Sequence, residues 1–194
     1  MTRPTLTGAA PEETRTRTAF EWLGIIGPVA GLAVAAVFLA NTSWYAVFKT
    51  FHVLAAILWL GGGALIAVLA WRAQRARDVA QLLQIAKQAE AASLRIFVPS
   101  SLVVVAMGFV LMHKRDFAYG DFWTLFGLIA WGLSFLIGAA FLGPEAGKLG
   151  RLLEAKDPDD PEVVARVTRI IAVARADVVL LLLVAIDMIA KPFA

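Results

Sequence analysis

The sequence predicts an all-α fold: an integral membrane helical bundle with five transmembrane helices. The first observation is composition, since 60% of the 194 residues are hydrophobic and only 17% are charged, whereas soluble domains are nearer half apolar and a quarter charged. The mean hydropathy of +0.75 agrees. The second observation is distribution, because the apolar residues gather in blocks of about 20, the length of helix that crosses the ~30 Å hydrocarbon layer. We therefore expect a multi-pass protein of a bacterial-type inner (plasma) membrane.

The five spans follow a polar N-terminal segment. Residues 1–19 are rich in Thr, Pro, Arg and Glu and cannot bury a core, which predicts a disordered cytoplasmic tail. Residues 20–194 are expected to form a single transmembrane helical domain. Its predicted spans cover residues 20–40, 44–71, 94–113, 123–142 and 170–190.

The connections between the spans carry their own signals. Residues 41–43, Asn-Thr-Ser, predict a tight turn. Residues 72–95 contain no Pro or Gly and place apolar residues at helical spacing, which predicts an amphipathic helical extension. Gly143-Pro144 is expected to stop the fourth span before a polar linker. Asp160-Pro161 then starts the last helix, and Pro192 ends it.

The distribution of Lys and Arg predicts the orientation. Fourteen of the 18 lie in the tail, after the second span and after the fourth, and four lie on the other side. The positive-inside rule then places the N-terminus in the cytoplasm and the C-terminus outside. The net charge of +3 is explained by this topology, so we expect no nucleic-acid partner.

Titratable groups at membrane depth are the candidates for chemistry, because each is costly there unless it is paired or functional. His52, His113 and Asp187 are expected in the outer third of the bilayer. Arg95, Arg175 and Asp177 are expected at the inner end, where snorkelling and a local ion pair account for them.

His52 shares one helix face with Ala56, Trp59 and Gly63, at i+4, i+7 and i+11. That face suits a neighbouring helix or a flat ligand. Spacing alone leaves two readings open: a histidine hydrogen-bonded to a neighbouring helix, or a metal or haem ligand. We expect Trp59 and Gly63 to be part of any cofactor site.

The second ligand and the orienting group are also open. His113 or Met112 could supply a second axial ligand on a facing helix. Asp187 could orient the His52 ring from the second coordination shell, or it could simply pair with Lys191 at i+4. His52 and His113 together with methionines would also suit copper, although no Met-x-x-Met cluster occurs.

Several kinds of functional site are excluded or disfavoured because the chain lacks the residues or motifs that they need. There is no cysteine, which excludes disulfides, zinc-thiolate sites and cysteine nucleophiles. Nothing has hydrolase spacing or the form of a phosphate loop, and the Gly61–Gly63 run lies inside an apolar segment. Whether the chain is an enzyme stays open.

The segment FKTFHVLAAILWLGGG, residues 48–63, resembles the first core helix of the CopD-like membrane proteins. These include the copper-resistance D proteins, the HemJ-type protoporphyrinogen oxidases and an uncharacterised family of predicted integral membrane proteins, to which the likeness is closest. Residues 96–112 and 169–193 are similar to later helices of the group. The resemblance covers residues 44–193 and implies a four-helix core plus one N-terminal helix.

The resemblance also implies a function. In the HemJ-type oxidases the motif histidine is implicated in binding haem b, a role that falls on His52 here. The leading expectation is thus a haem b-binding membrane protein with a redox or haem-handling role. The alternatives are a structural or accessory subunit of a membrane complex without a cofactor, and a copper-handling membrane protein. Expected partners are the lipid bilayer and a membrane-protein partner or a second copy of the chain.

Overall fold

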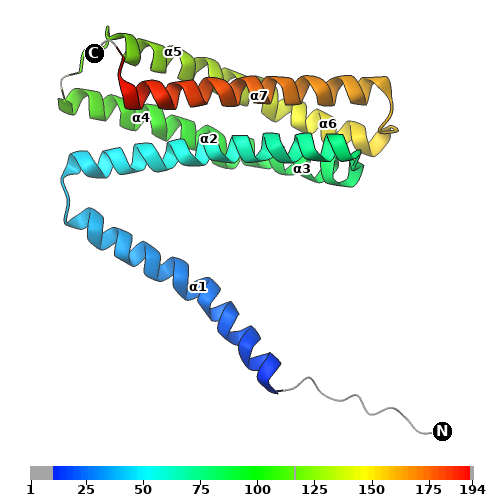
Figure 1. Ribbon diagram of the computed structural model, residues 1–194, viewed down its shortest axis with the longest axis horizontal. Helices are drawn as coiled ribbons and strands as arrows, with labels where there is room; N and C mark the ends of the chain where they lie inside the picture. Colours follow the sequence, from blue (N-terminus) through cyan, green and yellow to red (C-terminus); the bar gives the residue numbers. More distant parts are fainter. Residues whose placement is uncertain (1–10, 116, 193–194) are drawn as a thin grey trace. The chain divides into compact units, whose positions relative to one another are not determined.

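The computed structural model describes residues 11–115 and 117–192, and these form helices joined by short turns (Figure 1). The helices are α1 (Pro11–Ala40), α2 (Trp44–Ala76), α3 (Val79–Ala92), η1 (Ser93–Phe97), α4 (Val98–Arg115), α5 (Phe122–Leu136), η2 (Ile137–Leu142), α6 (Gly143–Ala155) and α7 (Pro161–Ala190). The chain divides into two compact units, residues 1–47 and 48–194. The predicted all-helical class is confirmed.

The first unit contains α1, a helix that begins at Pro11, upstream of the predicted start at residue 20. The first ten residues of the predicted tail lie outside the described residues. The apolar part of α1 is the segment Ile26–Ala40, which is shorter than a typical span. Residues 41–43 then turn the chain into α2, as the sequence predicts.

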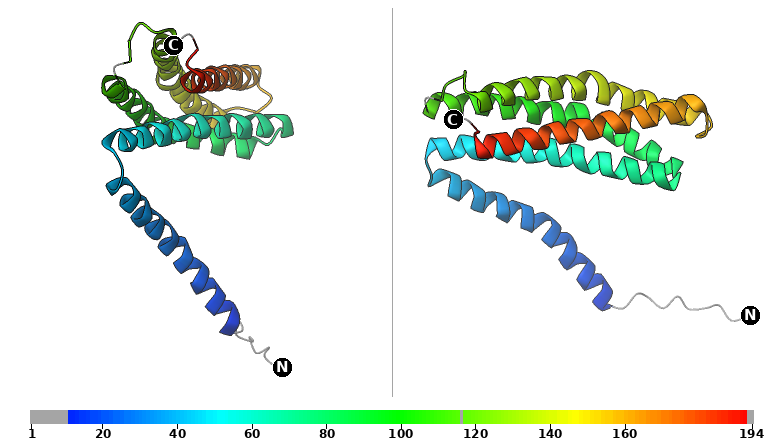
Figure 2. Two further views of the ribbon diagram at one scale, coloured as in Figure 1. Left: turned by 60° about the vertical axis from the view of Figure 1, so that its left-hand side comes forward. Right: turned by 45° about the horizontal axis from the view of Figure 1, so that its top comes forward.

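The second unit is an antiparallel bundle of four long rods: α2, α3-η1-α4, α5-η2-α6 and α7 (Figure 2). The closest packing joins α5 to α7 at one end and α3 to α6 at the other. Three of the described helices are long and apolar enough to cross a membrane: Trp44–Ala76, Val79–Arg115 and Phe122–Ala155. The protein is therefore a multi-pass membrane bundle, and the predicted total of five spans stays a prediction.

The helix α7 carries three charged residues, Arg175, Asp177 and Asp187, within its apolar stretch, and it is not among the candidate spans. It nevertheless packs along α5, which belongs to one of the three candidate spans. Asp177 and Asp187 are both buried. The two acidic residues of α7 therefore lie inside the bundle, whereas Arg175 is exposed.

Two of the rods contain a short π-helical segment shortly before a proline. Segment η1 precedes Pro99, and η2 precedes Pro144. Proline has no N–H to donate and its ring clashes with the carbonyl four residues earlier, and a π-type turn is a common way to keep such a helix continuous. The prediction that Gly143-Pro144 stops the fourth span is therefore wrong: the helix runs on through α6 to Ala155.

The end of the bundle that the charge distribution predicts to be the inner end has a core like that of a soluble protein. Its buried side chains come from α3, α6 and α7: Ala86, Leu149, Leu153, Val163, Val167 and Ile171. The predicted amphipathic extension after the second span is thus confirmed as the last turns of α2 and the helix α3. Most of the predicted polar linker is helical too, because α6 packs against α3 to form this core.

The last helix begins and ends as predicted. The side chain of Asp160 caps α7 by accepting a hydrogen bond of 2.8 Å from the backbone N–H of Glu162. That hydrogen bond, with the nearby Lys156, holds the pKa of Asp160 below its ordinary value. The helix ends at Ala190, and Lys191 adopts a left-handed conformation before Pro192.

The turn between α2 and α3 offers a simple test of backbone strain. Arg77 has a positive φ of 53°, a region that costs an L-residue roughly 1 kcal/mol and glycine nothing. We expect Arg77→Gly to raise the free energy of unfolding by about 0.5 kcal/mol, measured by thermal unfolding in detergent. Arg75→Gly, inside the last turn of α2, should destabilise instead, by roughly 0.5–1 kcal/mol. The same sign for both variants would contradict the argument.

Candidate functional site

His52 lies on α2 and faces α4. Its Nδ1 is 2.7 Å from the backbone carbonyl oxygen of Val104. Gly108, one turn further along α4, leaves room for the ring: a Cβ built at Gly108 would lie 3.5 Å from His52 Cε1. The histidine is therefore held between two helices by a hydrogen bond and by the absence of a side chain opposite it.

This contact fixes the tautomer of the ring. A carbonyl oxygen can only accept, so Nδ1 carries the proton and donates it to Val104. In the neutral ring, Nε2 then has a free lone pair. A backbone carbonyl on the non-coordinating nitrogen is also the usual arrangement around a ligating histidine, where it orients the ring and raises its basicity. The packing interpretation and the ligand interpretation of His52 are therefore compatible.

The structure does not bring His113 to His52. His113 is exposed in the last turn of α4. It follows Gly108 by five residues, which rotates it by about 140° around the helix. Met112 follows Gly108 by four residues, so it lies near the same face, and it is buried. Of the two candidate second ligands, Met112 is the better placed.

Asp187 is buried near the C-terminal end of α7. The hydrogen bond that we expected Asp187 to make with the His52 ring is made by the Val104 carbonyl instead. Asp187 Oδ2 has no hydrogen-bond partner within the described ranges. The expected partner Lys191 instead places its Nζ 4.0 Å from the ring centroid of Phe117 and 4.9 Å from that of Trp123. A cation–π contact thus occupies the lysine that the i,i+4 spacing assigned to Asp187.

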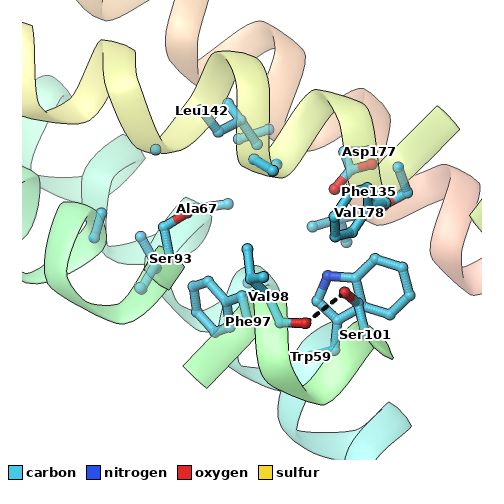
Figure 3. Close-up of a pocket in the computed structure, with 18 of the residues that line it drawn as sticks. Trp59, Ala67, Ser93, Phe97, Val98, Ser101, Phe135, Leu142, Asp177 and Val178 are labelled. Carbon is cyan, nitrogen blue, oxygen red and sulfur yellow. Dashed lines mark hydrogen bonds between the residues drawn. The ribbon is translucent and has the colours of Figure 1, made fainter. Parts of the chain in front are cut away.

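Trp59 and Gly63 line a cavity inside the bundle, and His52 is not one of its lining residues. The cavity has a volume of about 110 Å³. Figure 3 shows Trp59 and Ser101 on one side of it and Asp177 on the other. The face shared by His52, Trp59 and Gly63 is therefore divided between two environments: the contact with α4 and the internal cavity.

Sequence reasoning missed Asp177 as a functional candidate. The local ion pair expected there is not formed by its neighbour Arg175, whose guanidinium lies over the Trp71 ring, 4.9 Å from the centroid. Asp177 is instead 8% exposed and lines the cavity. The sequence does contain a signal for Asp177, because it is an acidic residue followed by a long apolar run. An ionisable residue within a membrane helix is by itself a reason to propose a function.

The titratable side chains do not form a ready-made metal centre. Among the residues whose side chains the structure describes, no three His, Cys, Asp or Glu side chains lie close enough together to hold a metal ion.

These features define an integral membrane helical bundle in which a histidine of α2 is hydrogen-bonded to α4 and a buried aspartate lines a cavity. Residues 46–192 match the family model described as "Predicted integral membrane protein (DUF2269)". The match covers most of the chain, and the chain belongs to this family. It agrees with the expected uncharacterised family of membrane proteins, while the wider CopD-like grouping stays an expectation. No curated protein and no solved structure matches the chain.

Proposed function

We propose that the protein binds haem b, with His52 as the axial ligand, and acts in redox chemistry or haem handling in the membrane. One observation carries the proposal: Nδ1 of His52 is hydrogen-bonded to the Val104 carbonyl at 2.7 Å, which leaves Nε2 as the coordinating atom. A bound haem supplies one-electron chemistry at its iron. The chain supplies the ligand and its orientation.

The donor fits a haem, whereas the internal cavity does not. A cavity of about 110 Å³ is too small for a porphyrin. His52 does not line that cavity and is half-buried. The proposal therefore places the cofactor against His52 and leaves Trp59 and Gly63 to the cavity wall.

Positive charges at the same end of the bundle favour haem over a bare metal ion. Lys49 precedes His52 by three residues and is exposed, as are His113 and Lys114 at the end of α4. The carboxylates of haem propionates need cationic or polar partners near the membrane surface. In this proposal His113 is a neighbour of the propionates rather than a ligand, and Met112 is the one candidate for a second axial position.

The test is the absorption spectrum of the protein purified from cells supplied with haem. We expect a Soret band that His52→Gln abolishes, because glutamine can still donate to Val104 but does not provide an imidazole. The matched control is His113→Gln, which should keep the band. Circular dichroism and gel filtration establish that both variants are folded. A colourless wild-type protein that also fails to take up added haem would end the proposal.

The other two functions are outcomes of the same experiment. Copper at His52, measured by elemental analysis and lost in His52→Gln, would favour copper handling. A colourless, metal-free protein that co-purifies with a partner in mild detergent would favour an accessory subunit. No contact among the described residues favours either of them over haem.

A further inference from the structure

The cavity between the four rods is a second site, separate from His52. Its walls come from every rod of the second unit, including both π-helical segments: Ser93 and Phe97 of η1, and Gly138, Ala139 and Leu142 of η2. π-Helical turns often occur at functional positions in helices. Here the two segments contact each other, and a Cβ on Gly143, the residue that follows η2, would meet the Ser93 hydroxyl.

The polar groups of the cavity are buried and incompletely bonded. Asp177 is 8% exposed and Ser134 is fully buried. The Ser134 hydroxyl lies near the Asp177 carboxyl, but neither Ser134 Oγ nor Asp177 Oδ1 has a hydrogen-bond partner in the described part of the chain. Ser101 lines the opposite wall, where its hydroxyl donates to the Val98 carbonyl at 2.9 Å and keeps a lone pair free.

The charge of Asp177 is not balanced by a side chain in the cavity wall. Among the lining residues from all four rods, Asp177 is the one titratable or charged group. Three arginines of the same helix have other partners: Arg175 lies over Trp71, while Arg166 and Arg169 bind Glu145. A carboxylate at this depth is strongly unfavourable without a counter-charge. The counter-charge must therefore come from a bound species.

We propose that Asp177 binds one small exchangeable positive charge, a proton or a sodium ion, together with water in this cavity. A volume of about 110 Å³ has room for more than one water molecule. The unpartnered oxygens of Asp177 and Ser134 supply the polar contacts that such waters or a sodium ion need. When sodium binds to the protonated carboxyl, the carboxyl releases its proton to water, so that charge is conserved.

Other ligand classes fit the cavity less well. A divalent cation would usually require more than one carboxylate, and the wall contains one. An anion would face an acid and no cationic group. A drug-sized apolar ligand needs a pocket of ~300 Å³ or more, which exceeds this cavity.

The first experiment uses the unaltered protein. A hydrophobic carbodiimide reacts with a protonated carboxyl in apolar surroundings, and mass spectrometry locates the modified residue. We expect Asp177 to be modified, and we expect either sodium or alkaline pH to suppress the modification. Suppression by sodium at constant pH identifies a sodium site, while suppression by alkaline pH alone identifies a proton site. The labelling of Asp187, which is buried on the same helix, is measured in the same sample for comparison with that of Asp177.

The second experiment combines two measurements on the purified protein. Calorimetric titration with sodium chloride measures the heat of sodium binding, and potassium chloride is the control for ionic strength. Infrared spectroscopy of the carboxyl C=O band follows the protonation of the carboxyl. Asp177→Asn should remove the sodium heat or the titrating band, and Asp187→Asn should keep it. A wild-type protein that binds no sodium and whose Asp177 neither titrates nor changes in labelling would overturn the proposal. Asp177→Asn should also keep any haem absorption, so this site and the haem proposal can fail independently.

Discussion

Replacing Glu145 with alanine is expected to lower the free energy of unfolding by roughly 2–3 kcal/mol. Glu145 is buried on α6 and joins this helix to α7. Its Oε2 accepts hydrogen bonds from Arg166 at 2.7 Å and from Arg169 at 3.0 Å, and its Oε1 accepts one from Lys148 at 2.9 Å. One carboxylate thus holds three cationic groups next to the core of the inner end.

The size of the effect follows from what the substitution leaves behind. The Arg166 side chain is 20% exposed, and its Nε already has no hydrogen-bond partner among the residues described. Without Glu145, this mostly buried guanidinium lies beside the space that the carboxylate filled and keeps only its longer ion pair with Glu162, at 3.6 Å. Arg169 and Lys148 are 57% and 55% exposed, so water can replace their contacts and they add little. The loss therefore comes mainly from Arg166.

Thermal unfolding in detergent, followed by circular dichroism, measures this effect. Glu154→Ala is the matched control, because Glu154 lies on the same helix and its ion pair with Lys87 is about half exposed on both sides. Surface pairs of this kind contribute about 0–1 kcal/mol. Equal losses in the two variants would mean that the buried carboxylate has no special role in joining α6 to α7.

The parts of the fold that the sequence predicts correctly are those with local signals. Asp160 followed by Pro161 combines a capping side chain with a residue that suits the first helical turn, and α7 begins there. The Asn-Thr-Ser turn separates two apolar runs, and α1 ends at Ala40. In both places the neighbouring residues decide the conformation, so no knowledge of distant contacts is needed.

The Gly143-Pro144 prediction fails because the decisive contacts are not local. Proline and glycine usually end a helix, but η2 accommodates Pro144 and α6 then packs against α3, more than fifty residues earlier. A glycine at position 143 suits this arrangement, since its Cα faces the Ser93 hydroxyl. The sequence does not reveal that the small residue serves a helix contact rather than a stop.

The candidate site is predicted only in part, because some of its decisive contacts are not local in the sequence either. His52 stands out as one of only two histidines, so its importance can be inferred from its type and place. Its partner cannot be inferred, because Val104 contributes a backbone carbonyl that has no sequence signature. Asp177 was assigned to an inner-end ion pair because Arg175 is close in sequence, whereas helix geometry directs the two side chains to different neighbours.

Replacing Gly108 with leucine is expected to displace the His52 ring and to abolish haem binding. A Cβ at this position would lie 3.5 Å from His52 Cε1 and 3.7 Å from Nδ1, which is ordinary van der Waals contact. The further carbons of leucine must then occupy space that the imidazole fills. The hydrogen bond to Val104 should break, and overpacking should lower stability by about 1–3 kcal/mol.

Two variants control for size and for position. Gly108→Ala adds only the Cβ that the structure tolerates, and it removes a glycine from a helix, which contributes up to about 1 kcal/mol of stability. It should keep both the fold and the Soret band. Gly132→Leu, in α5, places the same side chain where a Cβ would meet no atom within 4 Å. It should also keep the band.

The comparison separates the two interpretations of His52. If the histidine only packs, Gly108→Leu lowers the melting temperature, and no variant changes an absorption spectrum, because there is none to change. If the histidine is a ligand, the absorption spectrum depends on the position of the ring. The Soret band is then unchanged in Gly108→Ala and lost in Gly108→Leu. An unchanged band in Gly132→Leu shows that adding a leucine to the bundle is not itself the cause of the loss. A Soret band of full intensity in Gly108→Leu would show that haem binds without an imidazole fixed by Val104, which would remove the observation on which the proposed function rests.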